Sequence, residues 1–387
     1  MCQDTCLLRY IFRDYEVHTM EKVRAFLARK NITFSAKRYF IDAMSAMAQG
    51  LFCTLLVGTI LDTIGKQFGI GFLTDTFLTI KQGDVTFYYT IGGFCSLMVG
   101  PAMAVAIGKA LEAPPLVLFS LITVGFATNV LGGTGGPLAV FFVAILAAEV
   151  GKAISKETKI DILVTPIVTI LAGIGFAALV ARPIGTAATS VGDAIKWATE
   201  LQPFFMGILV SVIIGVALTL PISSAAICAA LGLTGLAGGA AVAGCCAQMV
   251  GFAIMSFREN RWGGLAAQGL GTSMLQMGNI VRNPRIWIPP TLAAAITGPV
   301  ATCLFRLEMN GAPVSSGMGT CGLVGQIGVY TGWVSDVAAG TKAAITGMDW
   351  LGLVLISFVL PAVLTWLIAI PLRKWGWIKD GDLKLDL

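Results

Sequence analysis

The sequence has few charged residues and a single histidine. Of its 387 residues, 12% are charged and 56% are hydrophobic, and the mean hydropathy is +0.83. Because soluble globular domains typically carry about 25% charged residues, this composition excludes an ordinary soluble fold. The histidine, His18, lies in a charged N-terminal stretch, which excludes a histidine-based metal site or catalytic dyad.

The nine cysteines give no indication of a metal centre or of redox chemistry. They are scattered, and most lie within apolar runs, as Cys228, Cys245 and Cys246 do. A buried cysteine usually packs as a small hydrophobic residue, and no spacing here matches a metal-ligand pattern. We therefore expect no metal, no cofactor and no catalytic residue, and an enzyme activity of the chain by itself is the least favoured function. The net charge of +5 is concentrated at segment ends, so it predicts topology and no nucleic-acid partner.

The sequence consists largely of long apolar runs. Each is long enough to cross a bilayer, which requires about 20 residues, and 46 glycines would let such helices approach closely. We therefore predict an all-α polytopic membrane protein with about ten transmembrane helices, embedded in a lipid bilayer. The runs cover roughly residues 40–65, 87–108, 115–131, 137–155, 162–181, 204–220, 225–256, 286–305 and 350–372. Residues 181–202 alternate apolar and polar character at helical spacing, which predicts a separate amphipathic helix on the surface.

Basic residues cluster between some of the runs and orient them. KAISKETK (152–159), FRENRW (257–262) and RKWGWIK (373–379) are basic, as is the N-terminal stretch. The positive-inside rule places these segments, and both termini, on the cytoplasmic side of a bacterial plasma membrane. The segments 66–85 and 183–200 would then include the outward loops.

This pattern divides the chain into three parts. Residues 1–38 form a basic N-terminal segment, residues 39–372 a single membrane domain, and residues 373–387 a cytoplasmic tail. Within the first part, residues 20–38 fit either an amphipathic helix on the anionic leaflet or a basic flank that orients the first span.

Four segments of the membrane domain do not fit unbroken helices. They are the glycine-rich run 131–137, TLPISSAA (219–226), GTSMLQMGNIVRNPRIWIPP (271–290) and RLEMNGAPVSSGMGTCGLVGQ (306–326). Non-helical chain at membrane depth persists only where protein buries it or where it lines a wet cavity. The four segments therefore predict re-entrant hairpins and discontinuous helices, the elements with which transporters bind solutes.

Polar side chains in these segments are the candidate solute ligands. A carboxylate at bilayer depth costs about 2.5–3.5 kcal/mol, so Glu308 is a candidate unless it pairs with Arg306 or lies at the interface. Amides can donate and accept, as a polyol requires, although they also join helices to one another. Hydroxyls can instead bond back to their own helix. The candidate substrate-binding residues are Gln276, Asn279, Asn283, Glu308, Asn310, Ser315, Ser316, Thr219 and Ser223. The candidate hinge, which could also be a point of close packing, consists of Gly132, Gly133, Gly135 and Gly136.

Two stretches resemble a known family. The run ETKIDILVTPIVTILAGIGFAALVARPIGTAATSVGDAIKWATELQPFFMGILVSVIIGVALTLPISSAA (157–226) and the segment NPRIWIPP (283–290) are similar to the enzyme IIC subunits of the bacterial phosphotransferase system. The pattern is closest to the fructose-type branch and to stand-alone IIC-type proteins, a subgroup that includes membrane proteins described as toxin-gene regulators. The resemblance covers residues 38–372.

The resemblance implies a homodimer in which re-entrant hairpins line one solute site. It also implies that a transport domain moves against a dimerisation scaffold. In this family the phosphoryl group passes from IIA to IIB, and IIB phosphorylates the sugar on release, so separate IIA and IIB proteins would be the partners.

The chain departs from the family in two ways. Where the family has an acidic residue before the Asn-Pro pair, this sequence reads GTSMLQM, and the membrane region contains no histidine. We therefore expect a transporter for a sugar or related polar solute. Two alternatives stay open, namely an ion-coupled secondary transporter of the same fold, with Glu308 as the coupling carboxylate, and a membrane sensor or regulator that retains the fold without transport.

Overall fold

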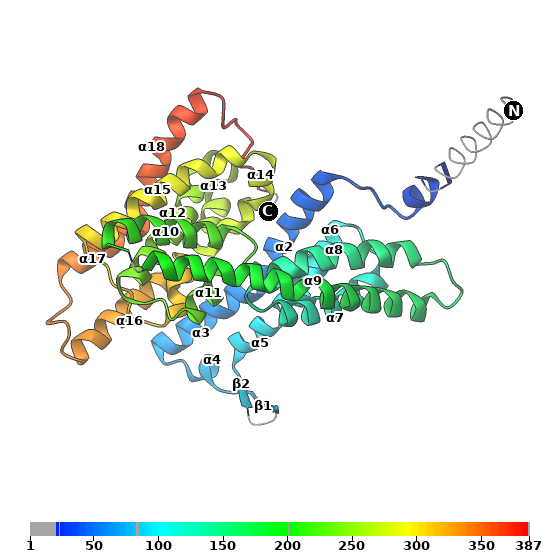
Figure 1. The fold of residues 1–387 in the computed structure, drawn as a ribbon, viewed down its shortest axis with the longest axis horizontal. Helices are drawn as coiled ribbons and strands as arrows, with labels where there is room; N and C mark the ends of the chain where they lie inside the picture. The colour runs from blue at the N-terminus through cyan, green and yellow to red at the C-terminus, as the bar shows by residue number, and fades with distance from the viewer. Residues whose placement is uncertain (1–20, 23, 83–84, 200, 386–387) are drawn as a thin grey trace, which may run out of the picture.

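The computed structural model describes residues 21–22, 24–82, 85–199 and 201–385, and these residues form an almost wholly helical protein (Figure 1). The exception is one antiparallel pair of strands, β1 (Leu78–Gln82) and β2 (Val85–Tyr89), in which Leu78 lies opposite Tyr89. The prediction of an all-α polytopic membrane protein is confirmed.

The helices pack in two groups. The first group includes α6, α7, α8 and α9, which contact one another, and α2, which packs on α6. Its helices are α2 (Ala43–Leu51), α3 (Val57–Phe68), α4 (Gly71–Thr74), α5 (Ile91–Leu97), α6 (Val99–Ala110), α7 (Pro115–Gly132), α8 (Gly136–Ile154) and α9 (Asp161–Thr199).

The second group surrounds α12, whose side chains are almost all buried and mostly small. The helices α10, α15 and α18 pack around α12. The group comprises α10 (Pro203–Thr219), α11 (Ser224–Ala230), α12 (Gly235–Met255), α13 (Phe257–Ala266), α14 (Met277–Arg282), α15 (Ile288–Pro299), α16 (Val324–Ala338), α17 (Gly347–Val354) and α18 (Leu360–Lys374).

Seven helical stretches in the described residues are long and apolar enough to cross a membrane, or eight if the bent pair α5–α6 counts as one. The expected number of about ten is not reached. One reason is that α10 has only 17 residues, and another is that the predicted run 87–108 is bent by 48° between α5 and α6.

The prediction for residues 162–202 is wrong in one respect. The sequence predicts a span that ends near residue 181 and a separate surface helix, but α9 is continuous over 39 residues. Pro183 lies inside this helix. A proline removes one backbone hydrogen bond, and packing can offset that loss. Such packing is present next to Pro183, where Gly185 lies against the carbonyl oxygen of Gly132.

The predicted cytoplasmic segments are joined to neighbouring parts of the chain in two places. Arg29 pairs with Glu157 at 2.8 Å and thereby joins the described part of the N-terminal segment to the loop before α9. Arg373 donates to the Met255 carbonyl oxygen at 2.9 Å and joins the end of α18 to the end of α12. Figure 1 shows the β1–β2 hairpin on the opposite side of the ribbon from α14.

Candidate functional site

Residues 257–283 form a re-entrant hairpin. Its start and its end both contact the C-terminal segment, which is defined here as residues 375–385. Asn260 Nδ2 donates to the Leu383 carbonyl oxygen at 2.7 Å, and Asn283 Nδ2 donates to the Trp377 carbonyl oxygen at 2.9 Å. The chain therefore returns to the end at which it entered. It turns around Gly271, between a π-helical turn (Ala267–Gly271) and a 3₁₀ turn (Ser273–Gln276).

Residues 306–338 form a second hairpin, which enters from the opposite end. Asn310 Nδ2 donates to Asp336 Oδ2 at 2.8 Å, so the two arms of this hairpin begin and end together. The first arm contains 3₁₀ turns at Pro313–Gly317 and Cys321–Leu323, and the return arm is α16.

The helices α10 and α11 form a third reversal. Thr302 Oγ1 donates to the Pro203 carbonyl oxygen at 2.8 Å, and Gly235 pairs with Met309 through backbone hydrogen bonds of 3.0 and 3.1 Å. Pro203 and Gly235 therefore both lie beside the segment 302–309, and the chain between them turns at residues 220–223.

The tips of the three reversals meet and are joined by hydrogen bonds. Ser224 Oγ donates to the Gly317 carbonyl oxygen at 2.8 Å, and Thr320 Oγ1 donates to the Gly269 carbonyl oxygen at 2.5 Å. These hydroxyls satisfy carbonyl groups that the irregular backbone leaves without helical partners.

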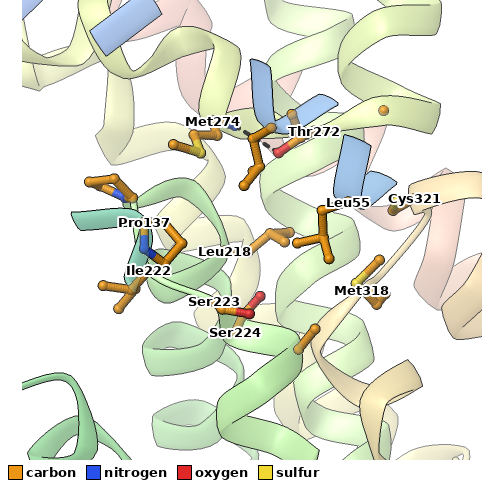
Figure 2. A pocket seen from close by; sticks show the side chains of 14 residues that line it. Leu55, Pro137, Leu218, Ile222, Ser223, Ser224, Thr272, Met274, Met318 and Cys321 are labelled. Carbon is orange, nitrogen blue, oxygen red and sulfur yellow. Dashed lines mark hydrogen bonds between the residues drawn. The ribbon is translucent and has the colours of Figure 1, made fainter. Parts of the chain in front are cut away.

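A cavity lies where the tips meet, and we call it the inner cavity (Figure 2). It comprises about 480 Å³, including the open space at its mouth. Its few polar groups include the hydroxyls of Ser223, Ser224 and Thr272. The lining residues are Leu51, Leu55, Pro137, Leu218, Pro221, Ile222, Ser223, Ser224, Ala225, Gly271, Thr272, Met274, Met318 and Cys321. All four irregular segments predicted from the sequence contribute to this lining.

A larger cavity, of about 1210 Å³ with the open space at its mouth included, adjoins the inner one, and we call it the outer cavity. The two share Leu55, Ser223 and Ala225. The outer cavity adds the hydroxyls of Thr59, Ser96, Ser315 and Thr331 and the carboxylate of Asp62.

Asp62 lines the outer cavity, and the sequence interpretation did not include it among the candidate residues. It lies near the end of the first predicted run, 40–65, and a carboxylate in such a run is itself a signal of function. Asp62 lies in the regular helix α3, outside the four broken segments.

The candidate hydroxyl residues separate into two kinds. Ser223 and Ser315 line the outer cavity. Thr219 and Ser316 are fully buried and bonded within the protein. The Thr219 hydroxyl lies 2.8 Å from that of Ser273, and Ser316 Oγ donates to the Leu233 carbonyl oxygen at 2.6 Å.

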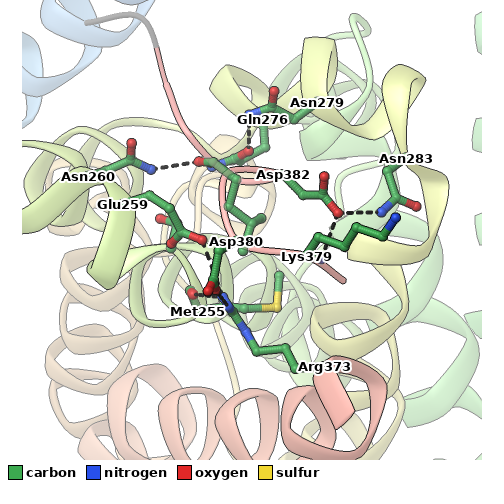
Figure 3. A network of polar contacts seen from close by, with 12 residues as sticks. Met255, Glu259, Asn260, Gln276, Asn279, Asn283, Arg373, Lys379, Asp380 and Asp382 are labelled. Carbon is green, nitrogen blue, oxygen red and sulfur yellow. Dashed lines mark hydrogen bonds and ion pairs between the residues drawn. The ribbon is translucent and has the colours of Figure 1, made fainter. Parts of the chain in front are cut away.

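The three candidate amides bind the C-terminal segment (Figure 3). Gln276 Nε2 donates to the Leu383 carbonyl oxygen at 3.0 Å, and Asn279 Nδ2 donates to the Lys384 carbonyl oxygen at 2.9 Å. Asn283 Nδ2 donates to Asp382 Oδ2 at 2.8 Å. The amides therefore hold the hairpin 257–283 to the C-terminal segment in this conformation, and none of them lines the inner or outer cavity.

Glu308 and Asn310 line a third cavity, of about 1000 Å³ with its open space included, together with Asp336, Lys342 and Asp349. Asn310 Nδ2 lies 3.2 Å from Glu308 Oε2, and Lys342 pairs with Asp349 at 2.8 Å. No lining residue is common to this cavity and the outer cavity. The predicted ligands therefore do not form one site, because two line the outer cavity, two line this third cavity, and the other five are bonded within the protein.

The four candidate hinge glycines form a tight connection between α7 and α8. Gly133 has a φ of +52°, which favours glycine, and Gly133–Gly135 is a single 3₁₀ turn. A Cβ atom on Gly135 would lie 2.8 Å from the carbonyl oxygen of Ile184 in α9, so this turn packs directly on another helix. Pro137, directly after the turn, reaches the inner cavity.

Comparison with known proteins gives one match. The family model described as "Phosphotransferase system, EIIC" matches residues 41–385, which include every residue that lines the inner and outer cavities. No curated protein and no solved structure gives a significant match to the chain.

Proposed function

We propose that this chain, which belongs to the phosphotransferase system EIIC family, is a membrane permease for a sugar or a related polar solute. The observation that supports the proposal is the meeting of three re-entrant tips around the inner and outer cavities. Helix ends and freed backbone groups of this kind form solute sites in transporters.

The position of the cavities suits alternating access. Leu51, Leu55 and Pro137 come from the first group of helices, whereas Thr272 and Met318 come from the second. A movement of one group against the other would therefore change the shape of the cavities. We propose that the two groups move in this way within a homodimer.

The outer cavity leads toward the end that carries the β1–β2 hairpin, because its residue Asp62 contacts Thr90, directly after β2. At the other end, the amides of the hairpin 257–283 bind the C-terminal segment. We propose that this conformation receives solute from outside the cell. Separate IIA and IIB proteins would then phosphorylate the solute at the cytoplasmic end.

A block of the cavity tests the proposal. Ser223 lies where the inner and outer cavities join, so Ser223→Trp should fill the junction. The purified protein is reconstituted in liposomes, and the flux of radiolabelled fructose, glucose, mannitol and galactitol is measured. We expect the wild type to transport at least one of these solutes and Ser223→Trp to reduce that flux more than tenfold. The matched control is Ser190→Trp, at an exposed position on α9, which should transport normally.

The same assay separates the alternatives. Equal flux through both tryptophan variants would refute the placement of the site, provided that both elute as folded protein. In cells, uptake that requires IIA and IIB indicates phosphorylation coupling. Uptake that persists without them and collapses with an uncoupler indicates ion coupling.

A further inference from the structure

Asp62 is held in a fixed orientation at the wall of the outer cavity. It follows Thr59 by three residues on α3, and both line the cavity. Thr90 Oγ1 donates to Asp62 Oδ1 at 2.9 Å. The backbone of Gly92 packs against the carboxyl group so closely that a Cβ atom there would overlap it.

Among the lining residues that the structure describes, Asp62 alone carries a formal charge in the outer cavity. The other lining residues are apolar or carry hydroxyls, and among the residues whose side chains the structure describes no lysine or arginine forms an ion pair with Asp62. A carboxylate can only accept hydrogen bonds, and it does so more strongly than a neutral group. It also repels anions, and the repulsion grows as water is excluded from the cavity.

We propose that Asp62 is a solute-binding residue that selects uncharged polyhydroxyl solutes and rejects their phosphorylated forms. This inference rests on the proposed function, whose site it describes in more detail. Hydroxyl groups of a sugar or sugar alcohol donate to the Asp62 carboxylate, while Thr59, Ser315 and Thr331 contribute hydroxyls around it. The phosphate group of a phosphorylated solute places negative charge beside the Asp62 carboxylate, and this repulsion weakens binding of the ester.

A metal cation fits the cavity less well. Cations such as Ca²⁺ take about six to eight oxygen ligands, several of them carboxylates. Among the described residues no group of three His, Cys, Asp or Glu side chains could hold a metal ion. The geometry therefore favours a neutral solute, and the test includes the cation as a contrary outcome.

Binding is measured on the purified full-length protein by thermal stabilisation with fructose, glucose, mannitol and galactitol. The phosphate esters of the same compounds are measured in parallel. We expect at least one neutral compound to bind the wild type at least tenfold more tightly than its phosphate ester. Asp62→Asn keeps the size of the side chain and removes the charge, so it should weaken binding of that compound at least tenfold and reduce the discrimination against the ester.

Two further variants make the result specific. Asp75→Asn removes a carboxylate from an exposed position after α4, outside all described cavities, and should bind as the wild type does. Thr90→Val removes the hydroxyl that orients Asp62 and keeps the charge, so it should weaken binding less than Asp62→Asn does and preserve the rejection of the ester.

The contrary results are distinct. Unchanged affinity of Asp62→Asn overturns the role of Asp62 and leaves the proposed transport intact if flux through the wild type is observed. If Asp62→Asn keeps its sugar affinity but Na⁺ no longer affects binding, the proposed role of Asp62 as a solute ligand is overturned in favour of a cation-binding role. A wild-type protein that neither binds nor transports any of the neutral compounds overturns both this inference and the proposed function.

Discussion

At the scale of single residues, Gly244 shows that the packing of the central helix α12 depends on glycine. A Cβ atom at Gly244 would lie 1.9 Å from the carbonyl oxygen of Ser211 in α10, so the two backbones are in direct contact. Such close approach is how small residues hold membrane helices together, because lipid removes most of the hydrophobic driving force between them.

Replacement of Gly244 by alanine should therefore destabilise the protein. We expect Gly244→Ala to cost about 1–3 kcal/mol, the usual range for an overpacked core, and to lower the melting temperature in detergent. Gly175→Ala in α9 is the matched control, because a Cβ atom there meets no other atom within 4 Å. Alanine at that position should be neutral or stabilise by about 0.5–1 kcal/mol. A melting temperature of Gly244→Ala equal to that of the control would contradict the close contact of α10 and α12.

The residues of the site were only partly predictable from the sequence. Ser223 and Ser315 were predictable, because a helix break beside a hydroxyl marks chain that must line protein or a cavity. The role of Asn279 was not predictable, because its partner Lys384 lies 105 residues away and offers a backbone carbonyl that no side-chain pattern reveals. Asp62 was missed because a carboxylate near the end of an apolar run is compatible with an interface position, where charge costs little.

The C-terminal segment is the element whose packing role is least apparent from the sequence. Residues 375–385 form no regular helix in the structure, yet Leu383 is 0% exposed and Ile378 is 2% exposed. Their backbone accepts hydrogen bonds from Asn260, Gln276 and Asn283. The C-terminal segment, although polar in sequence, therefore packs against one end of the hairpin 257–283.

We predict that Leu383→Ala destabilises the folded protein. Removal of a fully buried leucine side chain costs about 2–5 kcal/mol, through lost burial and a residual cavity. Trp375→Ala, in the same segment but 67% exposed, should change stability by no more than about 0.5 kcal/mol. The measurement is the melting temperature of each purified variant in one detergent. If Leu383→Ala melts with the wild type, the C-terminal segment does not pack on the hairpin in solution.

Helix boundaries were predicted well where apolar runs are bounded by turn residues, and less well elsewhere. The run predicted at 115–131 corresponds to α7, which begins at Pro115 and ends before the glycine turn. The run at 162–181 was predicted too short because the amphipathic pattern of residues 181–202 was interpreted as a separate surface helix. Local sequence gives this polarity pattern, whereas the packing of α9 on Gly132 and Gly135 comes from residues about 50 positions away.

At the scale of the whole molecule, the two ends differ in chemistry. Basic residues gather near the predicted cytoplasmic end, and Trp262, which is 74% exposed, and Trp375, which is 67% exposed, lie beside them. Tryptophan is enriched at membrane interfaces, and lysine and arginine are enriched on the cytoplasmic side. The end that carries α4 and the β1–β2 hairpin lies on the opposite side of the ribbon (Figure 1). The positive-inside rule therefore predicts that the outer cavity is directed away from the cytoplasm.

Cysteine labelling from the two sides of the membrane tests this orientation. Trp262→Cys places a thiol in the basic loop, and Phe72→Cys places one on α4, where Phe72 is 66% exposed. An impermeant maleimide should label Phe72→Cys in intact cells and should label Trp262→Cys only after the membrane is permeabilised. The unsubstituted protein gives the background from its own cysteines, of which Cys53 and Cys303 are exposed. The reverse pattern would place the outer cavity toward the cytoplasm. A maleimide that cannot cross the bilayer reaches only one end of the molecule, so labelling of both positions from one side would contradict the arrangement of the two ends.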